Sequence, residues 1–202
     1  MVNEPRPGPH RRIEVVALAS SLGGLAATGR VLSGLPADFA AAVVVLQHVE
    51  ARRVSRLAEL LQVHSAMPVK QAEHGEALIP GRVFVAPPGH HLLIHADATL
   101  SLSETIAVHF VRPSADILFR SLAEALGRRA VAVILTGSGV DGTEGCEAVR
   151  GAGGRVLAQD RASSEHFGMP SSAIGADAVD EILPLDAIAA RLTALVAEGG
   201  RP

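Results

Sequence analysis

The sequence predicts an α/β fold: a doubly wound, mostly parallel sheet with helices on both faces and an inserted β-hairpin region. Two observations carry this prediction. Short apolar runs rich in Val, Ile and Leu alternate with helical patterns, as they do in sheets that are buried on both faces. The middle of the chain instead carries very short segments between Pro-Gly, Pro-Pro-Gly and Asp-containing turns, a spacing typical of β-hairpins.

The predicted sheet begins after a polar segment. Residues 1–12 contain three prolines and are expected to form a disordered tail, and one domain is expected over residues 13–198. Proline cannot continue a helix, so Pro36 ends the first one. The expected elements of the first part are strands at Ile13–Ala19 and Ala41–Leu46, a small-residue turn at Ser20–Gly24, and helices at Leu25–Leu35 and Val54–Gln62.

The middle and the last part of the chain complete the prediction. Ser114 is an expected N-cap, and Asp116 lies in the first turn of the helix that follows. The hairpin segments are Val69–His74, Arg82–Val85, Leu92–His95 and Thr99–Leu102. Then come a helix at Ser114–Leu126, a strand at Ala130–Leu135, a loop at Thr136–Gly142, a helix at Thr143–Arg150, a strand at Arg155–Ala158, a short helix opened by Pro170, and a last helix, Ala187–Ala197, capped by Asp186.

Composition excludes several classes of function. Aromatic residues make up 2% of the chain and the formal charge is -3, so neither base stacking nor attraction to phosphates favours a nucleic-acid partner. No apolar stretch reaches the length of a membrane span, and no secretory signal pattern is present. The one cysteine, Cys146, cannot form an intramolecular disulfide and is expected to be buried and inert, so a cytoplasmic location is expected. The only lysine, Lys70, does not lie in a Walker loop.

Three predicted strands end in residues that suit nucleophilic catalysis. Ser20 and Ser21 follow the first strand, His48 follows the second, and Asp141 lies in the glycine-rich loop after the third. The carboxyl ends of strands in such sheets are where ligands bind. A serine hydroxyl needs a base to take its proton, and a carboxylate on the other ring nitrogen orients a histidine for that task.

The residues alone leave alternatives open. Serines at a helix start are often caps, a histidine at a strand end is often structural, and Asp141 before Gly142 fits plain turn chemistry. Neither Gly-x-Gly-x-x-Gly nor Gly-x-Ser-x-Gly is present at the first turn, which disfavours a dinucleotide fold and an ordinary α/β-hydrolase. Ser20 and Ser21 remain in competition at this point.

Six short segments stand out along the chain: Ala17–Gly24, Val45–His48, Ala86–His91, Arg112–Phe119, Val133–Gly142 and Phe167–Pro170. Taken in this order, they are similar to the patterns Ile-Gly-Ala-Ser-Thr-Gly-Gly, Gln-His, Ala-Pro-Gly, Arg-Pro-Ser-x-Asp-x-Leu-Phe, Ile-Leu-Thr-Gly-Met-Gly-x-Asp-Gly and Phe-Gly-Met-Pro. As a set they resemble the CheB methylesterases of chemotaxis.

The resemblance implies a function and a site. It places the nucleophile at Ser21, the base at His48 and the orienting acid at Asp141. It implies hydrolysis of glutamate methyl esters on methylated chemoreceptors, with release of methanol, and glutamine deamidation in some members. No cofactor or metal is expected. Residues expected at the oxyanion or substrate side are Leu22, Ser138 and Arg112.

The sequence also departs from the family pattern. Leu22 replaces a threonine, Ser138 replaces a methionine, and the Met-Pro after the family histidine is Val49-Glu50. The twelve residues before the first strand leave no room for the receiver domain of typical members, so control by phosphorylation in cis is not expected. Two alternatives therefore remain: a non-catalytic regulatory or binding module on the same fold, and an esterase for another acyl substrate.

Other polar residues receive structural interpretations. His90, His91, His95 and His109 do not have the spacing of a zinc motif, so they are expected to be surface loop histidines. Arg112 either binds a substrate carboxylate or pairs with Asp116, and the pairing is slightly preferred.

Overall fold

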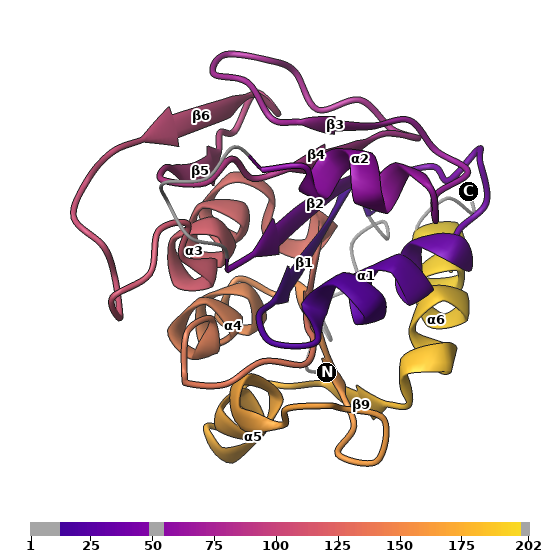
Figure 1. The fold of residues 1–202 in the computed structure, drawn as a ribbon, viewed down its shortest axis with the longest axis vertical. Coiled ribbons are helices and arrows are strands. Elements are labelled where there is room, and N and C mark those ends of the chain that lie inside the picture. The colour runs from indigo at the N-terminus through magenta and orange to yellow at the C-terminus, as the bar shows by residue number, and fades with distance from the viewer. Residues whose placement is uncertain (1–12, 49–54, 199–202) are drawn as a thin grey trace, which may run out of the picture.

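Seven parallel strands form one sheet at the centre of the computed structural model, which describes residues 13–48 and 55–198. The strand order is β3-β4-β2-β1-β7-β8-β9, and every neighbouring pair is parallel (Figure 1). The predicted fold class is confirmed. The strands of this sheet are β1 (Val15–Ser20), β2 (Ala42–Gln47), β3 (Val69–Gln71), β4 (Val83–Val85), β7 (Ala130–Ile134), β8 (Arg155–Gln159) and β9 (Glu181–Leu183).

Helices cover both faces of the sheet, one group on each side (Figure 1). Helices α3 (Ala115–Leu126), α4 (Thr143–Gly151) and α5 (Gly168–Gly175) share one apolar core with the sheet, and α1 (Gly24–Ser33), α2 (Leu57–Gln62) and α6 (Leu185–Glu198) share the other. A short 3-10 helix, η1 (Gly127–Arg129), links α3 to β7.

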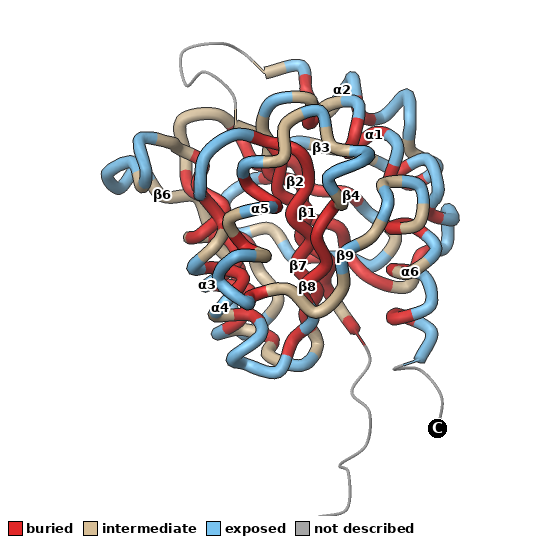
Figure 2. Tube along the Cα trace, turned by 90° about the horizontal axis from the view of Figure 1, so that it is seen from below, coloured by how far each residue is buried: buried red, intermediate tan, exposed pale blue. Residues whose placement is uncertain are grey.

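The two cores arise from the alternation of side chains along each strand. In β1, Val15, Ala17 and Ala19 belong to the core beneath α3 and α4, whereas Val16 and Leu18 belong to the core beneath α1 and α6. All six residues of β1 are buried, and the buried trace runs through the middle of the molecule (Figure 2). The continuous apolar runs of the sequence are therefore explained by helices on both sides.

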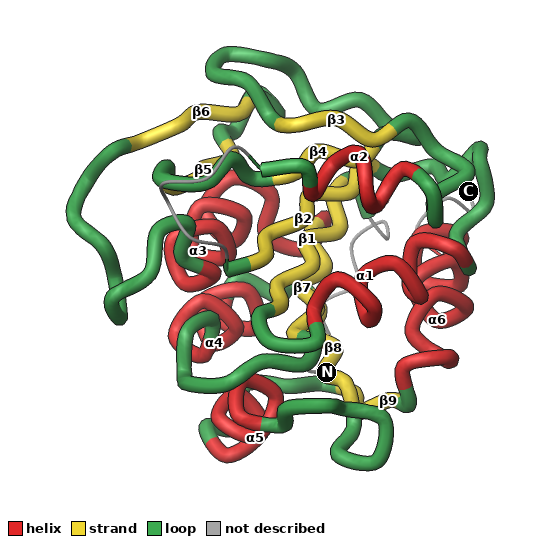
Figure 3. Tube along the Cα trace, in the orientation of Figure 1, coloured by secondary structure: helices red, strands yellow, loops and turns green. Residues whose placement is uncertain are grey.

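The region predicted as hairpins divides into two parts. Only β5 (His91–Ile94) and β6 (Leu100–Ser103) form an antiparallel hairpin, outside the main sheet (Figure 3). The prediction is wrong for β3 and β4, which are parallel strands of the main sheet. Three-residue strands carry too little periodicity to distinguish a parallel edge from a hairpin, so the pairing depends on the tertiary packing.

Smaller differences concern element ends. Strand β9 was not predicted, and α5 begins at Gly168, before Pro170. The predicted tail and the first residue of the predicted second helix lie outside the described residues. No helix in the described ranges combines the length and the apolar character that a membrane crossing demands.

The strand order determines where a ligand can bind. The chain places β2, β4 and β3 on one side of β1 and β7, β8 and β9 on the other, so the order reverses between β1 and β7. Ligands in open parallel sheets bind at such a reversal, beyond the carboxyl ends of the strands. The loops after β1, β2 and β7 meet at this place.

Candidate active site

Ser21 lies directly after β1, in the tight turn that leads into α1. Its amide donates a hydrogen bond to the Thr136 carbonyl at 3.0 Å, and its own carbonyl accepts one from Gly24 at 2.9 Å. Both hydrogen bonds fix the backbone on either side of the Ser21 hydroxyl. That hydroxyl has no hydrogen-bond partner among the described residues, and Ser21 is partly exposed. It is therefore held in place and accessible.

His48 is brought beside this turn by the pairing of β1 with β2. Ser20 is in register with Gln47, and the His48 amide donates to the Ser20 carbonyl at 3.1 Å. The His48 Nε2 atom lies 2.8 Å from Oδ2 of Asp141. This hydrogen bond leaves Nδ1 as the ring nitrogen that is free to accept a proton. Hydrogen bonds to a nucleophile are often long in unliganded enzymes, so the unbonded Ser21 hydroxyl is compatible with catalysis.

Asp141 is held by the N-terminus of α3. Its Oδ1 accepts hydrogen bonds from the Ser114 hydroxyl at 2.7 Å and the Asp116 amide at 3.2 Å. Its Oδ2 accepts one from the Ala115 amide at 2.6 Å, besides that from His48. A helix N-terminus is a favourable place for a negative charge. Ser114 was correctly predicted as the N-cap position, but its hydroxyl binds Asp141 and makes no capping hydrogen bond.

The hydrogen bonds decide the charge of Asp141. Burial alone would disfavour the carboxylate, since Asp141 is only 3% exposed. The hydrogen bonds from His48, Ala115 and Ser114 outweigh burial and hold the pKa of Asp141 below its usual value. An ionised carboxylate on Nε2 stabilises a protonated His48, which is what general-base catalysis by this histidine requires.

The two adjacent serines have different environments. Ser20 is fully buried, and its hydroxyl lies 3.3 Å from that of Thr28 in α1. The interpretation of Ser20 as a small packing residue is confirmed. Gly137 lies close behind Ser21, because a Cβ at position 137 would stand 2.8 Å from the Ser21 Cβ. The loop after β7 therefore supports the nucleophile candidate directly.

The backbone amides of Leu22 and Ser138 belong to the two loops that meet at Ser21. Leu22 is the next residue along the chain, and Ser138 follows Gly137, which contacts Ser21. Neither amide has an acceptor among the described residues, whereas the Ser21 amide is already bonded to Thr136. Free amides at the start of a helix and in a glycine-rich loop suit the binding of an oxyanion.

A groove of about 640 Å³ runs beside the Ser21 turn, along the first turns of α1. Gly23 and Gly24 line its end nearest Ser21, and Gln47, which precedes His48, lines one wall. Arg30 and His64 line it farther along α1. The groove has the volume of an ordinary ligand site.

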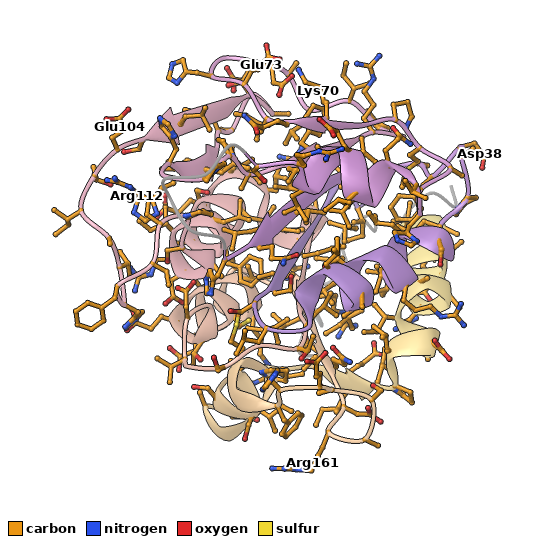
Figure 4. The ribbon with its side chains drawn as sticks, viewed as in Figure 1. Asp38, Lys70, Glu73, Glu104, Arg112 and Arg161 are labelled. Carbon is orange, nitrogen blue, oxygen red and sulfur yellow. The ribbon has the colours of Figure 1, made fainter. Side chains whose placement is uncertain are left out.

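Arg112 contacts backbone carbonyls, so the preferred pairing with Asp116 is wrong. The Arg112 guanidinium donates to the carbonyls of Glu104 at 2.7 Å and Thr105 at 2.8 Å. Arg112 and Glu104 lie near one another on the outer loop at the left of Figure 4. The loop curves back on itself, so that carbonyls seven and eight residues before Arg112 lie within hydrogen-bond distance of its guanidinium. Asp116 instead lies 3.3 Å from His109 Nε2 and accepts the Gly145 amide at 2.8 Å.

The expectation of surface histidines is wrong for His91. His91 is fully buried, whereas His95 is exposed and His90 is partly exposed. His91 is the first residue of β5, and the segment that precedes α3 covers its ring, because the two ring nitrogens lie 3.2 Å from the Ser114 amide and 3.1 Å from the Ile106 carbonyl. Within the described ranges, no group of three His, Cys, Asp or Glu side chains could hold a metal ion. Cys146 is buried as predicted, and burial raises the pKa of its thiol far above its ordinary range.

Sequence reasoning missed the residues that support the site. Thr136 donates from its hydroxyl toward the Leu22 carbonyl at 3.0 Å and accepts the His166 amide at 2.8 Å. The Gln159 side chain accepts the Thr136 amide at 2.8 Å. The position of Thr136 directly after a buried strand was a usable signal, but the partners of its hydroxyl depend on loops distant in sequence.

Known proteins are similar to this chain in sequence and in fold. Residues 16–192 match the family model described as CheB methylesterase. The chain is 46% identical over 188 residues to protein-glutamate methylesterase/protein-glutamine glutaminase 4 of Myxococcus xanthus, covering 93% of this chain and 52% of that protein. It is 41% identical to the protein-glutamate methylesterase FrzG of Myxococcus xanthus, covering 94% and 56%. The chain thus spans about half the length of these curated relatives.

A solved structure has the same fold. The crystal structure of the Thermotoga maritima CheB methylesterase catalytic domain matches with a TM-score of 0.87 and 36% sequence identity. The match covers 91% of this chain and 98% of that domain. The similarity therefore extends over nearly the whole of the catalytic domain.

Proposed function

Because this chain belongs to the CheB methylesterase family, we propose that it hydrolyses glutamate methyl esters on a chemoreceptor, with Ser21 as nucleophile. The observation that carries the proposal is the hydrogen bond between His48 and the ionised Asp141, next to the accessible Ser21 turn. The same machinery would deamidate glutamine, the second activity in the names of several relatives.

The geometry supports the following sequence of steps. His48 Nδ1 takes the proton of the Ser21 hydroxyl as Oγ attacks the ester carbonyl carbon. The amides of Leu22 and Ser138 hold the negative oxygen of the tetrahedral intermediate. The intermediate collapses, the carbon–oxygen bond to the methoxy group breaks, and His48 gives its proton to the leaving methanol. Water, deprotonated by His48, then attacks the acyl-enzyme, and the glutamate carboxylate and the Ser21 hydroxyl are released.

In this proposal Arg112 acts only through the loop that it holds. Its guanidinium fixes the loop that precedes α3, and α3 holds Asp141. The proposed partner is a methylated chemoreceptor, and the proposed location is the cytoplasm, since the one cysteine forms no intramolecular disulfide.

The decisive experiment is a methanol-release assay with a purified methylated receptor. Wild-type protein should release methanol, and Ser21→Ala should lose nearly all of this activity, whereas Ser20→Ala should fold and retain a measurable rate. Stoichiometric labelling of Ser21 by a fluorophosphonate should accompany the activity. Equal methanol release by wild type and Ser21→Ala would overturn the serine mechanism. An unlabelled, inactive wild type would instead support a non-catalytic module, and activity confined to small esters would indicate a different acyl substrate.

A further inference from the structure

The buried His91 has both ring nitrogens engaged, although it lies outside the proposed triad. Its Nδ1 accepts a hydrogen bond from the Ser114 amide at 3.2 Å, and its Nε2 lies 3.1 Å from the Ile106 carbonyl. An amide can only donate and a carbonyl can only accept. The neutral tautomer with its proton on Nε2 is therefore the one form of His91 that satisfies both partners.

Ser114 connects His91 to the site. The Ser114 amide is bonded to His91, and the Ser114 hydroxyl is bonded to Oδ1 of Asp141. The next amide, that of Ala115, is bonded to Oδ2 of Asp141, which also receives His48 Nε2. His91, Ser114 and Asp141 are all buried. A shift of the Ser114 backbone would therefore move two of the donors that orient the Asp141 carboxylate.

The other end of His91 holds the loop that precedes α3. Ile106 receives the His91 hydrogen bond, and Arg112 fixes the neighbouring carbonyls of Glu104 and Thr105. Two apolar side chains on this loop, Ile106 and Phe110, are 86% and 102% exposed. His91 thus has two separable contacts, one toward the catalytic acid and one toward an exposed loop.

We propose that His91 is a positioning residue for the methylesterase reaction, acting through the Ser114 backbone on the orientation of Asp141. The proposal rests on the proposed function, because it assigns His91 a role only if Asp141 orients the base. Residues that orient a functional side chain through one intermediate contribute about 10- to 100-fold to activity when they do so in metal sites, and a similar loss is expected here. If His91 had only a structural role, the loss of kcat in its variants would be proportional to their loss of thermal stability.

Two conservative variants separate the two contacts. In His91→Asn the side-chain oxygen can take the place of Nδ1 and accept from Ser114, but nothing reaches Ile106. In His91→Gln the longer side chain can donate to Ile106, but no acceptor stands at the Nδ1 position. Both variants leave one hydrogen-bonding group without its partner and change the fit of a fully buried side chain, so both should lose thermal stability. His95→Gln, at an exposed histidine of the same hairpin, is the matched control.

The expected result is a different effect on kcat at similar stability. His91→Gln should lower kcat about 10- to 100-fold with KM little changed, and it should slow fluorophosphonate labelling of Ser21 to a similar extent. His91→Asn should retain kcat within about threefold, and His95→Gln should match wild type.

Other results would overturn the inference. Equal losses of kcat in the two His91 variants, following their melting temperatures, would reduce His91 to a structural residue. Unchanged kcat in His91→Gln would do the same. These results are distinguishable from failure of the proposed function, because labelling of wild-type Ser21 and the Ser21→Ala control test the nucleophile independently. An unlabelled wild type would contradict both proposals.

Discussion

The Nε2 atom of His48 lies 2.8 Å from Oδ2 of Asp141, so the two side chains meet through the ring nitrogen farther from the His48 backbone. The nitrogen nearer the backbone, Nδ1, is the one that the proposed mechanism assigns to the proton of Ser21. Strand pairing places the Ser21 and His48 backbones side by side at the ends of β1 and β2. The nearer ring nitrogen, Nδ1, therefore suits a group on the adjacent turn, such as the Ser21 hydroxyl, and the farther one, Nε2, suits Asp141.

Asp141→Asn should lower kcat by about 10⁴-fold, because the variant no longer supplies the charge that stabilises a protonated His48. It should also destabilise the protein by about 1–3 kcal/mol. The two oxygens of Asp141 accept from Ala115 and Asp116 amides on opposite sides, so either orientation of an Asn amide group faces an N–H donor. Steady-state kinetics and denaturant unfolding measure the two effects. Asp177→Asn, at an exposed carboxylate, should change neither, and an Asp141→Asn enzyme as active as wild type would contradict the role of Asp141.

Ser114→Ala should reduce kcat about 10- to 100-fold, since the Asp141 carboxylate loses one of its orienting donors. Ser121, a second buried serine, which lies within α3, is the matched control. Its hydroxyl donates to the Leu118 carbonyl and accepts the Ile94 amide, with no contact to the site. Ser121→Ala should lose a similar stability of about 1–3 kcal/mol but keep kcat. If both variants lose activity in proportion to stability, the Ser114 hydroxyl has no specific role.

Gly137→Ala should inactivate the protein by displacing Ser21. A Cβ at this position would lie 2.3 Å from the Met169 sulfur and 2.8 Å from the Ser21 Cβ, and the fully buried Met169 has little room to adjust. Overpacking of this kind costs about 1–3 kcal/mol. Gly151→Ala is the control, because a Cβ there meets nothing within 4 Å. Melting temperature and fluorophosphonate labelling are the measurements, and normal labelling of Gly137→Ala would show that the site tolerates the methyl group.

The sequence predicted the central strands well because they are long, apolar and buried on both faces. β1, β2 and β7 differ from their predicted ranges only at the ends, and each is followed by one of the candidate site residues. The edge of the sheet was harder, because a three-residue strand such as β3 or β9 has almost no pattern of its own. Its pairing follows from the elements already in place.

Some residues of the candidate site could be predicted from the sequence, and the residues that support them could not. Ser21, His48 and Asp141 have chemical character that their positions after strands made visible, and the resemblance selected Ser21 over Ser20. Their supports could not be found in this way. Ser114 has the sequence signature of a helix cap. Its hydroxyl binds Asp141 instead of its own helix because the loop that carries Asp141, 27 residues later, packs against the start of α3.

Asp116 is a second buried carboxylate, whose ionisation is expected to cost stability. Burial raises the pKa of Asp116, and the nearby Asp141 adds to this, while the hydrogen bond from the Gly145 amide opposes both. A carboxyl group whose pKa is higher in the folded protein than in the unfolded chain favours folding when protonated. Its contribution is present below the unfolded pKa and is lost as the pH rises through the folded pKa.

Asp116→Asn should therefore gain stability relative to wild type as the pH increases. The Asn oxygen can still accept the Gly145 amide, and its amide group replaces Oδ2, which has no hydrogen-bond partner within the described residues and lies 3.3 Å from His109 Nε2. Melting temperatures at about pH 4 and about pH 8 measure the difference. The variant should compare more favourably with wild type at the higher pH. Because the two carboxyl groups interact, the variant also removes a like charge from beside Asp141 at the higher pH, which acts in the same direction.

Asp186→Asn is the control, because its stability relative to wild type should change with pH in the opposite direction. The hydrogen bond from Arg30 lowers the pKa of Asp186, so its ionised form favours folding above the unfolded pKa, and this is lost as the pH falls through the folded pKa. Asp186→Asn should accordingly compare less favourably with wild type at the higher pH, by a small margin because the pair is exposed. A stability difference between Asp116→Asn and wild type that does not change with pH would mean that Asp116 is no harder to ionise in the folded protein than in the unfolded chain.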